Sequence, residues 1–589
     1  MVVSATPHTT QLPGLGLPLN WILDQDGIDL FPNAANQRHV ELGLTRLPLT
    51  SLRELAMLRI LDRWTDKLDW HLKIFDEAVI AEWKAEALKI EWMTVSEFIV
   101  DCCINELRYK AKVFEKTGAI SLHRGEVVKS DSAVPVSLRE ELKIAVLLLE
   151  KIPTWCQDWK SDSNRQILSL IDPSLFPLVY GQTRAITGGP TTLQTFVGRC
   201  GEGAIVPVPP DSEAVMGNDR DDTCSYSFSR KFQWLPCNVD VSEGYRSTKI
   251  TSYINNLHPT KHANIYRVIE KIIGWTIPVW NMTLTPLRGN QQAIRVPYHF
   301  CTYEELEPGD EVEDEPEQGS DEDDEIFQER HMEWMAETHR VAQPLPDKFK
   351  PPGEPRNPVD LGKDYSDQGL QVIVRLENVH LTPEKPTYKC GPHIEGQINE
   401  HICATALYYY NCTNMGPSRL SFRQQSNPED ATIVDHPMHH HDWLIEVFGC
   451  EFDEAAVQEV GGVCIKEGRL VTWPNILQHQ VHMCLNDATQ PGHCKILVLY
   501  LVDPNIRIIS TADIPCQRKD WWAEAVIHQG GPLSRLPVEL RDYIFALVEE
   551  FPVGLDEAAE SRRKMAKERS AFADSIGELF EEDQFYCDH

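Results

Sequence analysis

The chain has 589 residues, of which 42% are hydrophobic, and a formal net charge of −33 at pH 7. This length exceeds what a single hydrophobic core usually supports, so we expect about two to four structural units. A charge this negative argues against non-specific nucleic-acid binding, which needs a basic surface.

The first residues and the cysteines bear on the compartment. Residues 1–14 are polar and contain proline without an apolar core, so we expect no signal peptide. No apolar run approaches the roughly 18 residues that cross a bilayer, so we expect no membrane partner. The 16 cysteines form no CxxC pair and lie mostly inside apolar runs. We therefore expect reduced, buried thiols in an intracellular protein, cytoplasmic or, as the alternative, nuclear.

The N-terminal half shows mainly helical periodicity. It is helical from Ser51 to about Lys116, and Thr94-x-x-Glu97 forms a capping-box pattern within it. A further helix is expected over about Ser137 to Lys151. We expect residues 1–300 to be mostly helical, with some strands joining the core.

The middle of the chain turns to loops and short strands from Asp172 onward. Between Lys249 and Pro259, the side chains of Asn255, Asn256 and His258 either line a pocket or form a hydrogen-bonded turn, and the composition favours the turn. A helix over Ala263 to Ile273 follows.

An acidic segment comes next. Residues Glu304 to Glu329 include 15 acidic residues and no Lys or Arg. Self-repulsion and the scarcity of apolar residues predict disorder for Glu304–Glu325, within an acidic insert or linker over residues 301–350. We expect it to be solvated first and a partner-binding segment second.

Beyond residue 351 the pattern becomes that of β-strands. Leu370–Leu381 is typical of a strand, and further strands are expected over Ile402–Tyr410, Arg419–Phe422, Leu444–Phe448, Gly462–Ile465, Leu470–Trp473 and Lys495–Val502. Many short strands separated by turns favour a jelly-roll, or double-stranded β-helix, over residues 351–515. Helices are expected over residues 516–589. The predicted class is α+β, with this β core flanked by helices on both sides.

Histidine and carboxylate pairs suggest a metal site in the β region. A His-x-acidic pattern occurs four times, at His39-x-Glu41, His331-x-Glu333, His393-x-Glu395 and His440-x-Asp442. Chance alone gives about three such matches in a chain of this composition, so the context has to choose between them. The first two precede the β region and have no core strand to lie on.

The chain length between ligands favours His393 and Glu395. Five expected strands fit between Glu395 and a second histidine at His479, enough for the chain to return beside the first pair, whereas only three fit after Asp442. The His-rich segment that ends at Asp442 remains the alternative. Two histidines and one carboxylate on one face bind Fe(II) and leave positions open for oxygen chemistry.

Two further choices concern the later residues of this pattern. His479 and His482 compete for the second histidine position, and His479 is preferred because it lies closer behind the strand that ends at Trp473. Lys495 begins the last strand, where it either holds the carboxylate of an organic acid co-substrate or faces water.

Several stretches resemble one large fungal family, catalogued as domain of unknown function 4246, over residues 40–589. They are Thr65–Trp70, Lys129–Asp131, Pro173–Pro177, Ser252–Pro259, Glu395–Glu400, Gly468–His479 and Leu501–Pro504. Separately, the order of His-x-Glu, distal His and basic residue is similar to that of Fe(II)/2-oxoglutarate dioxygenases, particularly the prolyl-hydroxylase-like ones. Two positions depart from the pattern of the fungal family. The residue before His393 is Pro392 where Trp is usual, and the residue before Lys495 is Cys494 where Arg is common.

The resemblance implies an Fe(II)/2-oxoglutarate-dependent oxygenase. His393, Glu395 and His479 would hold Fe(II), and Lys495 would pair with the C5 carboxylate of 2-oxoglutarate. Arg423 and Tyr408 would form the wall of the co-substrate pocket.

The substrate and the alternatives stay open. We expect a small-molecule substrate or a protein side chain, and the oligomeric state is left open. One alternative is a non-catalytic metal-binding jelly-roll that recruits a partner. The other is a metal-dependent enzyme that does not use 2-oxoglutarate.

Overall fold

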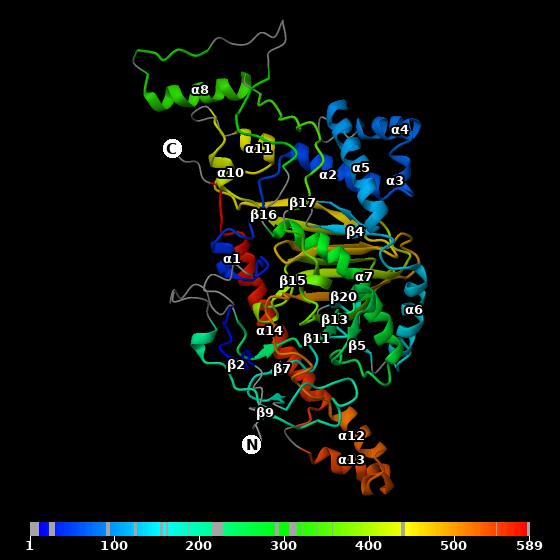
Figure 1. Ribbon diagram of the computed structural model, residues 1–589. Coiled ribbons are helices and arrows are strands. Elements are labelled where there is room, and N and C mark those ends of the chain that lie inside the picture. The colour runs from blue at the N-terminus through cyan, green and yellow to red at the C-terminus, as the bar shows by residue number, and fades with distance from the viewer. Residues whose placement is uncertain are drawn as a thin grey trace, which may run out of the picture.

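A computed structural model describes most of the chain. It covers residues 11–585 apart from 23–29, 90–94, 123–126, 154–156, 161–162, 187, 215–227, 289–293, 305–314, 321, 339, 356, 437–441 and 549–550. The described residues form the mixed α+β structure that was expected, built around one antiparallel sheet of ten strands and another of four (Figure 1).

Eight consecutive strands make up the whole of the small sheet and the centre of the large one. They are β13 (Leu370–Leu381), β14 (Thr387–His393), β15 (Ile402–Thr413), β16 (Arg419–Gln425), β17 (Val457–Cys464), β18 (Leu470–Pro474), β19 (Gln478–Cys484) and β20 (Gly492–Val502). Four of them lie in the large sheet in the order β13-β20-β15-β18, and the other four form the small sheet in the order β14-β19-β16-β17. The chain therefore crosses repeatedly between the sheets, and strands far apart in sequence become neighbours.

The N-terminal half extends the large sheet at both ends. Next to β18 lie β4 (Val128–Ser130) and β3 (Ile120–Ser121). On the side of β13 lie β11, β12, β6 and β5, which span Cys237–Asp240, Lys249–Ile250, Ile167–Ile171 and Asp158–Trp159. Short two-stranded pairs are formed by β1 (Leu12–Pro13) with β2 (Gly16–Leu17), β7 (Leu178–Val179) with β10 (Phe232–Gln233), and β8 (Arg184–Ala185) with β9 (Ala204–Ile205).

Two helices cover the outer face of the large sheet, α6 (Val136–Glu150) and α7 (Ala263–Leu284). Because side chains alternate along a strand, each strand of this sheet has one face toward these helices and one toward the small sheet. On β20, Leu497, Leu499 and Leu501 pack in the cluster that includes the helices. Ile496, Val498 and Tyr500 pack between the sheets. This alternation decides which predicted residues reach the site.

The other helices surround this β core. The N-terminal group comprises α1 (Gln37–Glu41), α2 (Leu52–Thr65), α3 (Trp70–Lys73), α4 (Glu77–Ala87) and α5 (Glu97–Thr117). Ser96 is the N-cap of α5, and its side chain accepts a hydrogen bond from the N–H of Ile99. Thr94, the cap predicted from sequence, lies outside the described residues.

The C-terminal helices are α12 (Lys519–His528), α13 (Val538–Ala546) and α14 (Leu555–Phe580). In Figure 1, α14 is the long red helix that runs beside the strands. Met565 of α14 packs in the core between the sheets. The Arg569 guanidinium donates to Glu400 and lies 3.9 Å from the ring centre of Trp234. The helix thus packs against one end of the two-sheet core.

Two predicted elements were wrong in kind or length. Residues Leu444–Phe448 belong to a helix, α11 (Asp442–Phe448), because the buried residues Trp443, Leu444, Val447 and Phe448 recur at helical spacing. Helix α7 continues eleven residues past the expected end at Ile273, through Pro278. Of the segment predicted to be disordered, Glu304–Glu325, only Asp324 and Glu325 belong to α8 (Asp324–Thr338), and residues 305–314 lie outside the described residues. The short helices α9 and α10 span Leu361–Asp364 and Glu429–Thr432.

Backbone hydrogen bonds join the residues on either side of the acidic insert. Tyr303 and Val341 form an antiparallel bridge, and the N–H of Ala342 donates to the carbonyl of Thr302 at 2.7 Å. In Figure 1, α8 projects from these residues at the top of the molecule, apart from the strands. Within the described residues, no helix combines the length and apolar character needed to span a bilayer.

Candidate metal centre

Three side chains converge at one end of the small sheet. His393 is the last residue of β14 and is paired in register with His479 of β19, while Glu395 follows two residues later. One potential ligand atom from each side chain lies within 4.8 Å of the others. The Nε2 atom of His479 is 3.5 Å from Oε1 of Glu395, and the two histidine rings are 4.3 Å apart. The structure therefore brings together the three residues predicted as metal ligands, in a group that could hold a metal ion.

The local backbone explains how Glu395 reaches this position. Gly396 adopts φ +75°, and a Cβ there would lie 2.7 Å from the side chain of Ile402, so the turn after Glu395 requires glycine. Asn475 fixes the same turn from β18's end: its Oδ1 accepts the N–H of Glu395 at 3.1 Å, and its Nδ2 donates to the Glu395 carbonyl at 3.0 Å. Asn475 thus holds the backbone of the carboxylate residue from both sides.

The two imidazoles are oriented differently. Nδ1 of His393 lies 2.8 Å from the carbonyl of Gly391 and donates to it, so Nε2 is the nitrogen that a metal would bind once its proton is displaced. The ring of His479 packs 4.8 Å from that of Trp473, and its Nδ1 is buried without a hydrogen-bond partner among the described residues. Two imidazoles and one carboxylate, with one buried nitrogen left unpaired, fit a divalent transition metal.

The charges of the three side chains are coupled. Burial favours a raised pKa for Glu395, but the hydrogen bond and charge of His479, with the charges of His393 and Arg375, lower its pKa to about 2. Burial and the charge of His393 lower the pKa of His479. Burial also acts to lower the pKa of His393, but the thiol of Cys390 and the Glu395 carboxylate raise it to about 9. A metal would therefore meet an ionised carboxylate and displace a proton from His393.

Lys495 does not reach this centre, which corrects the prediction that it anchors the co-substrate there. It lies on β20 between Cys494 and Ile496, which face the space between the sheets, so Lys495 points to the outer face. Its Nζ lies 2.7 and 2.8 Å from the two carboxylate oxygens of Glu150, at the end of α6. The lysine thus fastens a helix to the sheet.

Tyr408 and Arg423 are also on the wrong face for the predicted pocket wall. Tyr408 packs in the cluster beneath α6 and α7, whereas its neighbour Tyr409 faces the space between the sheets. Arg423 donates to Gln478 and to Glu581, while the preceding Phe422 is paired with His479 and packs inward. Neither side chain lies with the three candidate ligands, because neighbouring strand residues point to opposite faces and Tyr409 and Phe422 are the ones that pack between the sheets.

The competing histidines have other surroundings. His482 is exposed on β19, so the preference for His479 is consistent with burial. His39 is buried in α1 and accepts the N–H of Asn33 through Nδ1, and His331 of α8 lies 3.3 Å from Glu315. His440, of the His-rich alternative, lies outside the described residues.

A second group of potential ligands is already neutralised. Asp62 and Asp66 of α2 lie near Cys464. Lys129 contacts Asp62 at 2.7 Å and Asp66 at 2.6 Å, and Arg469 contacts Asp66 at 2.7 Å. With buried cations in these positions, the carboxylates form an ion network, and we assign no metal to it.

The chain turns at Asn255 and Asn256, where the N–H of Leu257 donates to the carbonyl of Ile254 at 3.0 Å, as the composition favoured. Nδ2 of Asn255 donates to the carbonyls of Leu175 and Phe176, and Nδ2 of Asn256 donates to that of Asp172. The two asparagines therefore fasten the loop that begins at Asp172.

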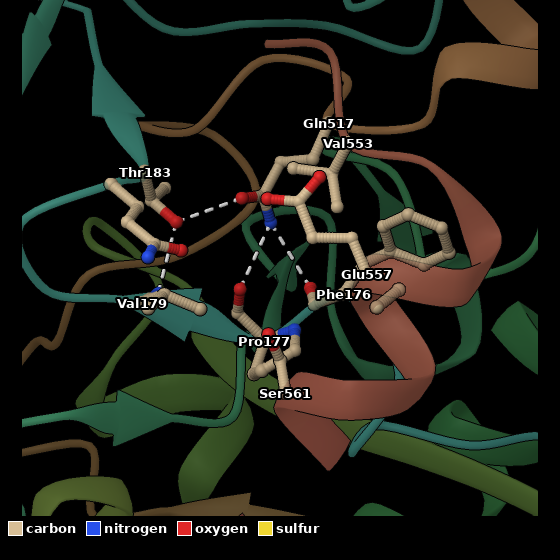
Figure 2. A pocket seen from close by; sticks show the side chains of 10 residues that line it. Phe176, Pro177, Val179, Thr183, Gln517, Val553, Glu557 and Ser561 are labelled. Carbon is tan, nitrogen blue, oxygen red and sulfur yellow. Dashed lines mark hydrogen bonds between the residues drawn. The ribbon is translucent and has the colours of Figure 1, made fainter. Parts of the chain in front are cut away.

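Two hollows in the described part of the chain differ in size and lining. The larger, of about 350 Å³, lies between α14 and the loop at Ser229, and it is lined in part by Gln397 and Phe572. Figure 2 shows the smaller, of about 20 Å³, where Thr183 donates to Gln517 and Gln517 donates to the carbonyls of Phe176 and Pro177. The smaller one has room for a single water molecule.

Sequence reasoning missed two residues near the centre. In the sequence, Asn475 is a polar residue between two expected strands, and nothing in the local pattern indicated a role at the metal centre. Arg375 of β13 lies between the sheets and is close enough to Glu395 to lower its pKa. The alternation of Leu370–Leu381 places Arg375 on the same face as Ile373, which was the available signal.

Comparison with known proteins gives a family over most of the chain. A model described as "Protein of unknown function (DUF4246)" matches residues 97–525, and one described as "Domain of unknown function DUF4246, N-terminal" matches residues 12–86. No curated protein matches.

Among solved structures, the chain is similar to the "Selenomethionine labeled Fe(II)/(alpha)ketoglutarate-dependent dioxygenase TqaL". The identity is 13% over 25% of this chain and 48% of that chain, with a TM-score of 0.15. The match thus spans about half the length of that structure.

Proposed function

This chain belongs to the DUF4246 family, and we propose that it is an Fe(II)/2-oxoglutarate-dependent oxygenase with a double-stranded β-helix core. The observation that carries the proposal is the grouping of His393, Glu395 and His479 within 4.8 Å. Two histidines and one carboxylate with open positions are typical of non-haem Fe(II) oxygenases.

The strand order supports the same proposal. Strands β13 to β20 are divided four and four between two antiparallel sheets, with every connection except that from β16 to β17 crossing from one sheet to the other, as in an eight-stranded jelly-roll. The three side chains lie at one end of the small sheet, and Phe422, Trp473 and Tyr500 pack between the sheets beside them. A substrate reaching the centre would therefore meet a largely apolar wall that excludes water.

The roles of the chain's own residues follow from this geometry. His393, Glu395 and His479 would hold Fe(II), which when bound supplies oxygen activation coupled to conversion of 2-oxoglutarate to succinate and oxidation of a substrate C–H bond. The carbonyl of Gly391 fixes the ring of His393, and Asn475 fixes the backbone of Glu395. These contacts would keep the ligand set in place when an open position is filled.

The substrate is proposed as a small molecule or a protein side chain. The hollow of about 350 Å³ beside α14 is of a size that suits a small organic group. Gln397, which follows Glu395 by two residues, lines this hollow.

One observation favours a second candidate function. Cys494 is buried between the sheets on β20, at the position where the family commonly has Arg. If that arginine is the co-substrate anchor elsewhere, its loss here favours a metal-dependent enzyme that does not use 2-oxoglutarate.

The test is iron-dependent turnover of 2-oxoglutarate. Purified protein with Fe(II), oxygen and 2-oxoglutarate is expected to release succinate even without the substrate, at a slow uncoupled rate. Glu395→Ala should abolish this release, because the carboxylate ligand is lost, while His482→Ala on the exposed side of β19 should retain it. Metal-loaded wild type that releases no succinate would favour the second candidate.

A further inference from the structure

The space between the sheets contains buried polar atoms without partners. Among the described residues, these include Oγ1 of Thr405, Oη of Tyr409, Nε1 of Trp473, Nδ1 of His479 and Oη of Tyr500. A buried polar group without a partner is costly, and a cluster of them calls for an explanation such as a bound polar ligand.

The strand registers place several of these groups at one level. Thr405 on β15 pairs with Trp473 on β18 and with Tyr500 on β20, and Tyr500 pairs with Ile373 on β13. The ring of Trp473 in turn contacts that of His479. The hydroxyls of Thr405 and Tyr500 and the indole of Trp473 therefore lie side by side on the inner face of the large sheet, next to a candidate metal ligand.

Arg375 adds a positive charge to this space. On β13, Ile373 and Val379 pack between the sheets, while Val374 and Leu376 pack toward the helices, so Arg375 shares the inner face. Nη2 of Arg375 lies 2.7 Å from Oε2 of Glu377, on one edge of the planar guanidinium. Recognition of a second carboxylate would use another edge of the same group.

Arg375 also lies near both the metal ligands and Tyr500. The charge of Glu395 is among the causes that raise the pKa of Arg375, although burial acts to lower it. Burial, followed by the charge of Glu395, raises the pKa of Tyr500, and the guanidinium opposes this rise. In the strand register, Arg375 is two residues from Ile373, which pairs with Tyr500, so Arg375 and Tyr500 lie diagonally across neighbouring strands on the same face of the sheet.

The hydrogen-bond donors and the net charge of these side chains favour a negatively charged ligand. Hydroxyls, an indole N–H and a guanidinium all donate hydrogen bonds. With a divalent cation at the triad, the cation and Arg375 outweigh Glu395 and Glu377 by one positive charge. An acid that chelates the metal at one end and carries a second carboxylate at the other matches this arrangement.

The neighbouring strand offers no cation in the same space. On β20 the inner face presents Cys494, Ile496, Val498 and Tyr500, and the one basic residue, Lys495, is paired with Glu150 on the outer face. A carboxylate entering between the sheets therefore meets the guanidinium from β13.

We propose that Arg375, together with the Tyr500 hydroxyl, binds the carboxylate of 2-oxoglutarate that is remote from the metal. This inference rests on the proposed function. It assigns the anchor to β13 in place of β20, and it explains how a chain with Cys494 at the family's arginine position retains a dicarboxylic co-substrate.

The test compares two acids on Fe(II)-loaded protein without oxygen. 2-Oxoglutarate carries the second carboxylate, whereas 2-oxobutyrate keeps the chelating 2-oxo acid and lacks it. Calorimetric titration is expected to show that Arg375→Gln weakens 2-oxoglutarate binding at least tenfold, and about a hundredfold if a bidentate contact is lost. Binding of 2-oxobutyrate should change less than about threefold. Arg375→Lys should restore part of the 2-oxoglutarate affinity.

Two controls keep the result interpretable. Lys495→Gln removes a cation from the outer face of the adjacent strand and should leave both affinities unchanged. Because Arg375→Gln leaves Glu377 without its cation, the paired variant Arg375→Gln/Glu377→Gln keeps the net charge constant, and it should show the same selective loss.

The outcomes separate this inference from the proposed function. Wild type that binds iron but neither acid would contradict the function itself, and the anchor with it. Equal affinity of wild type and Arg375→Gln for 2-oxoglutarate would contradict only the assignment of Arg375 as the carboxylate anchor. Equal weakening of both acids by Arg375→Gln would overturn it too, since the effect would not depend on the second carboxylate.

Discussion

Replacing Glu395 with Ala is expected to abolish stoichiometric iron binding by the purified protein. The carboxylate is the anionic member of the group formed with His393 and His479, and two neutral imidazoles hold a divalent ion much more weakly. Iron content after anaerobic loading and desalting measures the effect. We expect about one iron per wild-type chain and less than a tenth of that in the variant.

The same strand offers a matched control for the histidine ligand. His479→Ala should lose iron as Glu395→Ala does, whereas His482→Ala changes the same residue type three positions later on an exposed site and should keep it. Loss of iron in Asp442→Ala together with full retention in Glu395→Ala would move the centre to the His-rich segment. Thermal unfolding of each variant checks that the fold is intact.

Replacing Arg469 with Met is expected to lower the free energy of unfolding by about 3 kcal/mol. The Arg469 side chain is only 1% exposed and pairs with Asp66 and Asp131, each at 2.7 Å. Without it, Asp131 keeps only the exposed Lys466 as a cation, and Asp66 keeps only Lys129. The Asp66 and Asp131 side chains keep 23% and 36% exposure, so solvent screening places the loss at the lower end for buried pairs. Urea denaturation measures the change.

The matched control uses the other cation on the same carboxylate. Lys466 contacts Asp131 at 3.1 Å but is 53% exposed, so Lys466→Met should change the stability by less than about 1 kcal/mol. Equal effects of the two variants would contradict a network role for Arg469.

The pH dependence of this network has a definite sign. Burial acts to raise the pKa of Asp131, but its hydrogen bond and ion pair with Arg469 lower it to about 2. A lowered carboxyl pKa stabilises the folded state above the unfolded value of about 3.9, and that stability is lost as the pH falls through the folded value. The difference in unfolding free energy between wild type and Arg469→Met should therefore become smaller as the pH falls from about 4 to about 2. Thermal unfolding at pH 7 and pH 3 measures it.

The network also explains why separate stretches of the chain carry family residues. Asp66, Lys129, Asp131 and Arg469 come from three of the stretches that resemble the family, and the structure joins them in one set of ion pairs. A single sequence shows these residues as isolated charges. Their pairing across 403 positions, as between Asp66 and Arg469, depends on tertiary contacts that local patterns do not contain.

The strands that the sequence predicted are those with continuous apolar character. Leu370–Leu381 was predicted with its observed bounds, because its inner and outer faces are both buried. The strands β14 and β19 were missed, although they carry His393 and His479. Their residues are polar or partly exposed in the small sheet, as in Thr387–His393, so their hydrophobic pattern is weak.

The grouping of the three candidate ligands was easier to predict than the direction of single side chains. The choice of His393, Glu395 and His479 depended on chain length and strand number, which tolerate small errors. The choice of Lys495, Tyr408 and Arg423 depended on the face of a strand, where an error of one residue reverses the result. Cys494, Tyr409 and Phe422, their immediate neighbours, are the residues that pack between the sheets.

The measurement that tests the proposed oxygenase most directly is anaerobic titration of Fe(II)-loaded protein with 2-oxoglutarate, followed by visible absorption. Chelation of iron by the 2-oxo acid is expected to produce a weak visible band that saturates with the co-substrate in wild type and is absent in Glu395→Ala. No knowledge of the substrate is needed. An iron-loaded wild type that shows no band at millimolar 2-oxoglutarate would contradict the account and leave a metal-binding protein of other function.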